Sequence, residues 1–349
     1  MTDKTYNRDR LRAQIARYGK EHNIPPNSRV ESFMREYVAQ LIAAHGGNDC
    51  VLVGATSLLI RIPDIRLTTD IDIITVLTLE KFVDLFETSI SNDASVPFTF
   101  RVAQRSRIKG VTDGQSLILS AFLNGEIFHR TKIDISNKAI LPRDNLEAPR
   151  LSIPENDDKQ TIRIPVLPLP EYLADKIETL FSIHYNHQGN PVYKHRWHDL
   201  ADIALVASNL VLPDRPLIDE LVRRQAALQS FHIPDSFQIP DSTFTHANWE
   251  ISMRIKNLPD WLTLERAVEL AKSFLDPIFA IIGDGVLPTL PKVWSPSTRA
   301  WDYPSELVER VHQDEKPVHS VKPVAPQPSS ITVPNRRGIK QDKHHPRLR

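Results

Sequence analysis

Two aspartates inside one apolar run constrain this chain more than any other feature. The stretch VLVGATSLLIRIPDIRLTTDIDIITVL spans residues 51–77, and Asp70 and Asp72 stand two apart near its end. In a β-strand such residues point to the same face, while Ile71 and Ile73 face the other side. The two Cα atoms should lie about 6.6 Å apart, where two negative charges repel by about 2.5 kcal/mol at an effective dielectric constant of about 20. This strand needs either water or a cation beside it.

The carboxylate pair has two interpretations. Mg²⁺ takes carboxylate oxygens and substrate phosphates together, so the first is a metal platform for phosphoryl or nucleotidyl transfer. The second is an exposed edge strand with two solvated acids, which an Asp-x-Asp pattern on its own favours. The residues around the strand shift the balance toward the metal.

A turn of small residues lies upstream of the pair. Gly54, Ala55, Thr56 and Ser57 stand between a short apolar strand and a helical turn. Such a turn lets backbone N–H groups and hydroxyls approach a phosphate. It therefore predicts a phosphate contact close to the two aspartates.

Two further charged positions support the same chemistry. Arg66, four residues before the first aspartate, is a fixed cation able to clamp phosphate oxygens. Asp134 lies in TKIDIS on a later strand, where its isoleucine neighbours would face the core and Lys132 would share its face. If that strand neighbours the first, three carboxylates converge, which is enough for two ions.

The pattern along the chain predicts an α+β fold with a mixed sheet. Strand patterns cover CVLV, TDIDIITVL, FTFRVAQRSRIK, SLILSAFL and EIFHRTKIDIS, and helical patterns dominate from about residue 166. Asn124 and Gly125 predict a hairpin turn. We expect four parts: a polar N-terminal arm (1–27), an α+β core domain (28–165), a helical C-terminal domain (166–311) and a disordered, basic, proline-rich tail (312–349).

Basic side chains recur along one predicted strand. Arg101, Arg105, Arg107 and Lys109 are expected on one face of FTFRVAQRSRIK. They could follow an RNA backbone or hold nucleotide phosphates. A solvated strand face is the alternative.

Composition limits the class of protein. Formal net charge is zero over 349 residues, so any electropositive surface must be local. The chain has one cysteine, no signal-peptide pattern at its start and no apolar run of membrane-spanning length. We expect a soluble cytoplasmic protein without membrane contact.

These residues occur in an order that resembles the nucleotidyltransferase superfamily that includes DNA polymerase beta. Within it, the chain is most similar to the AbiEii type, toxins of type IV toxin–antitoxin systems. The motifs of that type appear here as GATS, RLTTDID, KIDIS, ADKIETL and RWHDLADI, between about residues 50 and 207. Each is common alone, and the order of all five is the specific signal. Ala55 departs from the pattern because the family has a second glycine there.

The resemblance implies roles for individual residues, with Asp70, Asp72 and Asp134 as the metal ligands. The predicted catalytic residues are Asp70, Asp72, Asp134, Lys176 and Asp199. The predicted nucleotide contacts are Gly54, Thr56, Ser57, Arg66 and Lys176. Arg196 would flank Asp199, and either Asp199 or Asp202 would enter the cleft.

The expected activity is a nucleotidyl transfer that depends on Mg²⁺, with Mn²⁺ as the alternative. A nucleoside triphosphate would bind between the core and helical domains, and an acceptor hydroxyl would attack its α-phosphate and release pyrophosphate. Asp134 could help to deprotonate that hydroxyl. The resemblance implies a tRNA 3′ end as acceptor, growth arrest as the outcome, and a cognate antitoxin as partner, often without a stable complex.

Two alternatives stay open. The protein could transfer a nucleotide to a small molecule such as an antibiotic, or to another protein. It could also be a nucleotide-binding module without turnover, although the complete set of acids argues against that interpretation.

Overall fold

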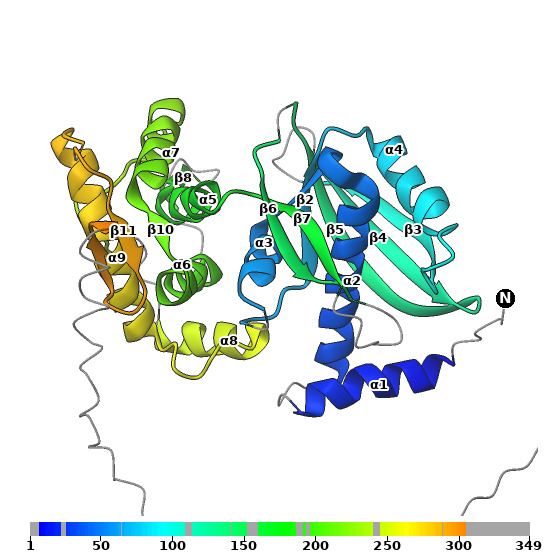
Figure 1. The fold of residues 1–349 in the computed structure, drawn as a ribbon. Coiled ribbons are helices and arrows are strands. Elements are labelled where there is room, and N and C mark those ends of the chain that lie inside the picture. Colours follow the sequence, from blue (N-terminus) through cyan, green and yellow to red (C-terminus); the bar gives the residue numbers. More distant parts are fainter. Residues whose placement is uncertain are drawn as a thin grey trace, which may run out of the picture. The chain divides into compact units, whose positions relative to one another are not determined.

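A seven-stranded mixed sheet forms the first half of the structure, a computed structural model (Figure 1). The structure describes residues 7–21, 26–63, 65–108, 114–139, 141–151, 160–185, 191–192, 196–239, 245–287 and 289–304. The order across the sheet is β3-β4-β5-β2-β1-β7-β6. The strands are β1 (Cys50–Val53), β2 (Asp70–Thr75), β3 (Thr99–Arg107), β4 (Gly114–Leu123), β5 (Glu126–Asn137), β6 (Asp144–Pro149) and β7 (Thr161–Val166).

Two pairs of strands in this sheet run parallel, and the others run antiparallel. β2 pairs with β5 and β1 pairs with β7 in parallel. The predicted β4–β5 hairpin turns at Asn124 and Gly125, both with positive φ, as a two-residue hairpin loop requires. Because β5 returns beside β2, residues distant in sequence meet at the middle of the sheet.

One face of the sheet, here called the covered face, packs on helices. It carries Ile71, Ile73 and Ile133, which belong to a buried cluster with α2 (Pro26–Gly46), α4 (Leu79–Asp84) and the π-helical turn η2 (Leu85–Ile90). Figure 1 shows α2 running across the strands. The opposite face carries the aspartates and is called the carboxylate face below.

A second buried cluster belongs to the helices that follow the sheet. Its members come mainly from α5, α6, α7 and α9, together with α3, which follows β1. The bounds are α3 (Gly54–Arg61), α5 (Leu169–Phe181), α6 (Trp197–Asn209), α7 (Asp214–Ala227), α8 (His246–Lys256) and α9 (Leu264–Asp284). Short strands β10 (Leu212–Pro213), β11 (Val293–Ser295) and β12 (Ala300–Asp302) pair with one another, as do β8 (His184–Tyr185) and β9 (Pro191–Val192).

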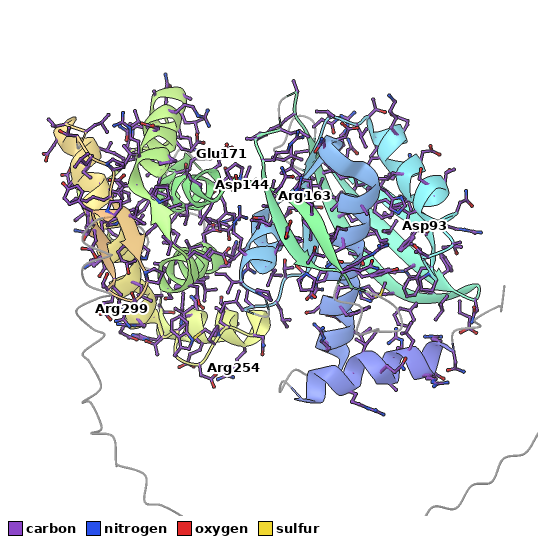
Figure 2. The ribbon with its side chains drawn as sticks, in the orientation of Figure 1. Asp93, Asp144, Arg163, Glu171, Arg254 and Arg299 are labelled. Atoms are coloured by element: carbon purple, nitrogen blue, oxygen red, sulfur yellow. The ribbon has the colours of Figure 1, made fainter. Side chains whose placement is uncertain are left out.

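Charged contacts also tie the sheet to neighbouring helices. Asp144, labelled at the start of β6 in Figure 2, lies 3.4 Å from the guanidinium of Arg61 on α3. The same guanidinium donates to the backbone oxygen of Leu167. The sheet and the helices that follow it belong to one compact unit, residues 1–306, so a domain border near residue 165 stays a prediction.

The fold class agrees with the prediction, and three segments differ in detail. The expected polar arm contains helix α1 (Arg8–Glu21), because Leu11 and Ile15 lie on one face and are buried against the sheet cluster. Strands β6 and β7 complete the sheet, and α8 adds a helix, although none of them is predicted from the sequence. The predicted disordered tail, 312–349, lies outside the described residues.

The longest helices in the described part of the chain are α2 and α9, with 21 residues each. Neither these two nor any shorter helix among the described residues is long and apolar enough to cross a membrane.

Candidate active site

Asp70, Asp72 and Asp134 come together on the carboxylate face. The parallel register places Asp72 opposite Asp134 and Asp70 opposite Lys132. One carboxylate oxygen from each aspartate lies within 4.8 Å of the other two, and each side chain is partly exposed. We refer to these three residues as the acid triad. The predicted convergence of the three acids is therefore present in the structure.

Gly54 makes the room that the acid triad needs. It has φ of +56°, and a Cβ built there would lie 2.2 Å from Asp72 Oδ2. Any other residue would meet both a left-handed backbone and a carboxylate oxygen. The turn after β1 thus approaches the acid triad as closely as a glycine allows.

Electrostatics at the acid triad favour a bound cation. Burial, together with the charges of Asp70 and Asp134, raises the pKa of Asp72 to about 7. Oδ1 of Asp134 is buried and has no hydrogen-bond partner among the described residues. Hard carboxylate oxygens are the ligands that Mg²⁺ and Mn²⁺ take. The donor set therefore fits a divalent cation.

Lys132 already supplies one positive charge to the acid triad. Its Nζ donates to Asp134 Oδ2 at 2.6 Å and to Asp70 Oδ2 at 3.3 Å. Burial lowers the pKa of Lys132, but both carboxylates outweigh burial and raise it. Strand alternation predicts Lys132 on this face, but no sequence motif gives it a role.

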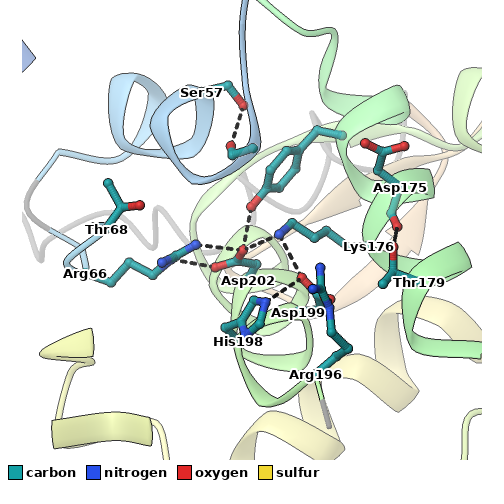
Figure 3. A network of polar contacts seen from close by, with 12 residues as sticks. Ser57, Arg66, Thr68, Asp175, Lys176, Thr179, Arg196, His198, Asp199 and Asp202 are labelled. Atoms are coloured by element: carbon teal, nitrogen blue, oxygen red, sulfur yellow. Dashed lines mark hydrogen bonds and ion pairs between the residues drawn. The ribbon is translucent and has the colours of Figure 1, made fainter. Parts of the chain in front are cut away.

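A second cluster of charges lies on α5 and α6 (Figure 3). Lys176 Nζ donates to Asp199 Oδ1 at 2.7 Å and lies 3.0 Å from Asp202 Oδ2. Asp199 and Asp202 are fully buried, and the Nε of Arg196 donates to Asp199. The positive charge of Lys176 partly offsets the rise in the pKa of Asp72, so this cluster lies within electrostatic range of the acid triad.

Arg66 and Tyr172 complete this cluster, which we call the buried ion network. Nη2 of Arg66 donates to Asp202 Oδ2 at 2.9 Å, and its Nε lies 2.7 Å from Oδ1. The hydroxyl of Tyr172 donates to Asp202 at 2.8 Å. Burial alone would raise the pKa of Asp202, but Arg66 and Lys176 outweigh burial and lower it to about 2.

The placement of Arg66 differs from the expected phosphate clamp. Its side chain is only 3% exposed, and its guanidinium is engaged by Asp202 and the backbone oxygen of Leu67. A guanidinium buried at this depth is held by a fixed carboxylate, while its contact with an incoming phosphate stays a prediction. Arg66 therefore joins the loop before β2 to α6.

Thr56 and Ser57 also lie deeper than a surface phosphate loop would place them. The Thr56 hydroxyl donates to the backbone oxygen of Asp70 at 3.4 Å, and the Ser57 hydroxyl donates to the backbone oxygen of Gly54 at 2.9 Å. Both side chains are buried. These bonds hold the turn against β2, while a role in triphosphate binding stays a prediction.

Tyr172 is the member of the buried ion network that the sequence motifs do not single out, whereas Asp202 is among the predicted candidates. Tyr172 stands four residues before Lys176 and so shares its helix face, and Asp202 stands three after Asp199. The burial of both aspartates has no local signal, because it depends on the partners that α5 and the loop before β2 provide.

The predicted basic stripe is divided by a β-bulge. The register of β3 against β4 shifts between Val102 and Gln104, so Ala103 is an extra residue. Arg101 pairs with Ser120 on the carboxylate face, whereas Arg105 pairs with Leu117 on the covered face. Lys109 lies outside the described residues.

Comparisons with known proteins give matches at low sequence identity. A comparison with curated proteins gave no match. MenT4, a nucleotidyltransferase toxin from Mycobacterium tuberculosis, aligns over 78% of this chain and 98% of its own, at 18% identity and a TM-score of 0.46. JHP933 from Helicobacter pylori aligns over 73% and 92%, at 12% identity and a TM-score of 0.39.

The family profile gives the decisive match. The profile described as nucleotidyl transferase AbiEii toxin, type IV toxin–antitoxin system, covers residues 36–273, which is more than half of the chain. This range contains the acid triad and the buried ion network. The chain therefore belongs to the AbiEii family of nucleotidyltransferase toxins.

Proposed function

We propose that this nucleotidyltransferase moves a nucleotide from a nucleoside triphosphate to an acceptor hydroxyl at a tRNA 3′ end. The single observation that supports the chemistry is the acid triad, assembled from β2 and β5 in register with Lys176 within electrostatic range. The choice of tRNA as acceptor rests on the resemblance to the AbiEii type. Growth arrest, and neutralisation by a cognate antitoxin, follow from the family and belong to the same proposal.

Asp70, Asp72 and Asp134 would hold Mg²⁺ or Mn²⁺. Such an ion, when bound, would supply positive charge to the phosphate oxygens and the acceptor oxygen. Asp134 keeps one oxygen, Oδ1, without a hydrogen-bond partner among the described residues. We assign to the carboxylate of Asp134 the proton that leaves the acceptor hydroxyl during attack on the α-phosphate.

Lys176 is held as a fixed positive charge. An ammonium has three donors, and Asp199 and Asp202 account for two of them. Burial lowers the pKa of Lys176, but Asp202, Tyr172 and Asp199 together raise it, so the ammonium stays charged at every physiological pH. Its third N–H would donate to the leaving pyrophosphate, while Asp199 positions the ammonium.

A transfer assay tests the proposal. The purified full chain is incubated with total tRNA, Mg²⁺ and each α-labelled triphosphate, in parallel with Asp70→Ala and with the control Asp219→Ala, which changes an exposed aspartate on α7. We expect label in tRNA with the wild type and the control, and none with Asp70→Ala. Label in a small molecule or a protein instead of tRNA would show that the acceptor is not tRNA. Nucleotide binding without transfer to any acceptor would refute the proposal.

A further inference from the structure

Strands β3, β4 and β5 extend the carboxylate face away from the acid triad. Strand register places on this face Thr99, Arg101, Gln104, Ser106, Ser116, Ile118, Ser120, Phe122, Ile127, Arg130, Lys132, Asp134 and Ser136. Asp134 is the single acid among them, and it lies at the end where the triad is. The rest of this set carries three cations, so it complements a polyanion.

The basic side chains are arranged in line with the site. Arg130, Lys132 and Asp134 are successive residues of β5 on this face, about 6.6 Å apart. Arg101, on the neighbouring edge of the sheet, is exposed like Arg130. Among the described residues, neither of these two guanidinium groups has a carboxylate partner. Both are therefore available to phosphate oxygens.

An aromatic ring lies beside these cations, at the next position of β4 on the same face. Phe122 is partly exposed, and the guanidinium of Arg101 lies over its ring, 5.6 Å from the centroid. Ile127 pairs with Phe122 on the same face and is 37% exposed. Aromatic rings and arginine planes on an open sheet are surfaces on which unpaired bases stack.

We propose that this part of the carboxylate face binds the single-stranded 3′ end of the acceptor RNA. The inference deepens the proposed function and rests on it. Arg101 and Arg130 contact phosphates, Phe122 stacks on an unpaired base, and the terminal hydroxyl reaches the acid triad past Lys132. The bulge at Ala103 decides which arginines of β3 belong to the proposed RNA surface. It leaves Arg101 on this face and places Arg105 and Arg107 on the other.

Arg105 and Arg107 provide a matched control on the same strand. They pair with Leu117 and Gln115, on the covered face. Hydrogen bonds to its own backbone N–H and to Thr78 lower the pKa of Glu80 on α4, and the charge of Arg105 adds a smaller decrease, so Arg105 lies near α4 on that side. The double variants Arg101→Gln with Arg130→Gln, and Arg105→Gln with Arg107→Gln, each remove two exposed positive charges. Only the first pair lies on the proposed surface.

Binding is measured by fluorescence anisotropy without triphosphate or divalent metal, so that no transfer occurs. The probes are a labelled RNA hairpin with an unpaired 3′ end and its blunt counterpart. We expect Arg101→Gln with Arg130→Gln to weaken hairpin binding about tenfold or more and to lower the salt slope by about 2. The control should change affinity by less than about twofold. Phe122→Ala should abolish the preference for the unpaired end over the blunt one.

Each result decides the inference. Equal losses in both double variants, no loss in either, or no RNA binding by the wild type would overturn it. Binding of an acidic peptide of equal charge with the same residue dependence would also overturn it, in favour of a protein partner. If the wild type labels tRNA but the first double variant binds RNA normally, only the inference fails. If label goes to another acceptor, the proposed function fails.

Discussion

The acid triad and the buried ion network use the same residue types for different purposes. The acid triad has three partly exposed carboxylates, and one ammonium, that of Lys132, lies beside them. In the buried ion network, two fully buried carboxylates are matched by Arg66, Lys176 and Arg196. An excess of negative charge open to solvent suits a ligand that comes and goes, whereas a satisfied buried cluster suits permanent positioning.

The largest expected effect is that of changing Asp72 in the acid triad, which should lower activity but raise stability. The change Asp72→Asn keeps the shape but removes a ligand charge, so we expect nucleotidyl transfer to fall about a thousandfold, which is about 4 kcal/mol of transition-state stabilisation. Its folded pKa, about 7, lies above the ordinary value of 3.8, so the ionised side chain destabilises the fold increasingly as pH rises between those values. At pH 8 the free energy of unfolding of the variant, measured in urea, should therefore exceed that of the wild type by about 1–3 kcal/mol. Lower stability at pH 8 would contradict this account.

Removing an acid from the buried ion network should have the opposite effect on stability. Asp202→Ala leaves Arg66 and Lys176 without a shared partner, and such a loss costs about 3–5 kcal/mol in urea unfolding. The control Asp219→Ala breaks an exposed pair with Arg215 and should cost about 0.5 kcal/mol or less. Similar losses in the two variants would remove the distinction between the clusters.

Lys132 offers a way to measure how much the acid triad depends on a cation. Lys132→Met removes the ammonium that bridges Asp70 and Asp134, so we expect Mn²⁺ to bind about tenfold more tightly, as measured by calorimetry without substrate. Lys138→Met is the control. It removes the same charge from an exposed lysine that forms no ion pair among the described residues, and it should change Mn²⁺ affinity little. An unchanged or weaker affinity in Lys132→Met would show that Lys132 supports the metal rather than competing with it.

The smallest expected effect concerns His198, beside the buried ion network. Its Nε2 lies 3.6 Å from Asp199, but burial, with Arg196 and Lys176 nearby, outweighs that carboxylate and lowers its pKa from 6.5 to about 4. The imidazole is therefore neutral at pH 7, and stability should fall as pH drops from 6.5 to 4, where the unfolded chain binds the proton more readily. His198→Gln should reduce this slope in urea unfolding, and an unaltered slope would assign it to other groups, such as His129.

The acid triad could be predicted from sequence because its signals are local. Strand alternation fixes the face of Asp70, Asp72 and Asp134, and the hairpin turn at residues 124–125 makes the return of the chain foreseeable. Their convergence also needed β5 to pair with β2, which rested on the resemblance rather than on the pattern.

Other features depend on tertiary contacts that no local pattern encodes. The sequence predicts Arg66 as a fixed cation able to clamp phosphate, and only the packing of α6 gives it Asp202 as a partner. The extra residue at Ala103 leaves no clear trace in an alternating pattern, yet it changes the face of every later residue of β3. Strands β6 and β7 are short and carry proline at Pro149 and Pro165, which weakens a strand signal.

The parallel pairing of β2 with β5 also has a consequence for biosynthesis. A ribosome making this chain has to complete β3, β4 and β5 before Asp134 can reach Asp72, and it has to continue through α6 before Lys176 meets its two anions. A nascent chain therefore has neither the assembled acid triad nor the complete buried ion network until Asp202 has been added and α6 has folded.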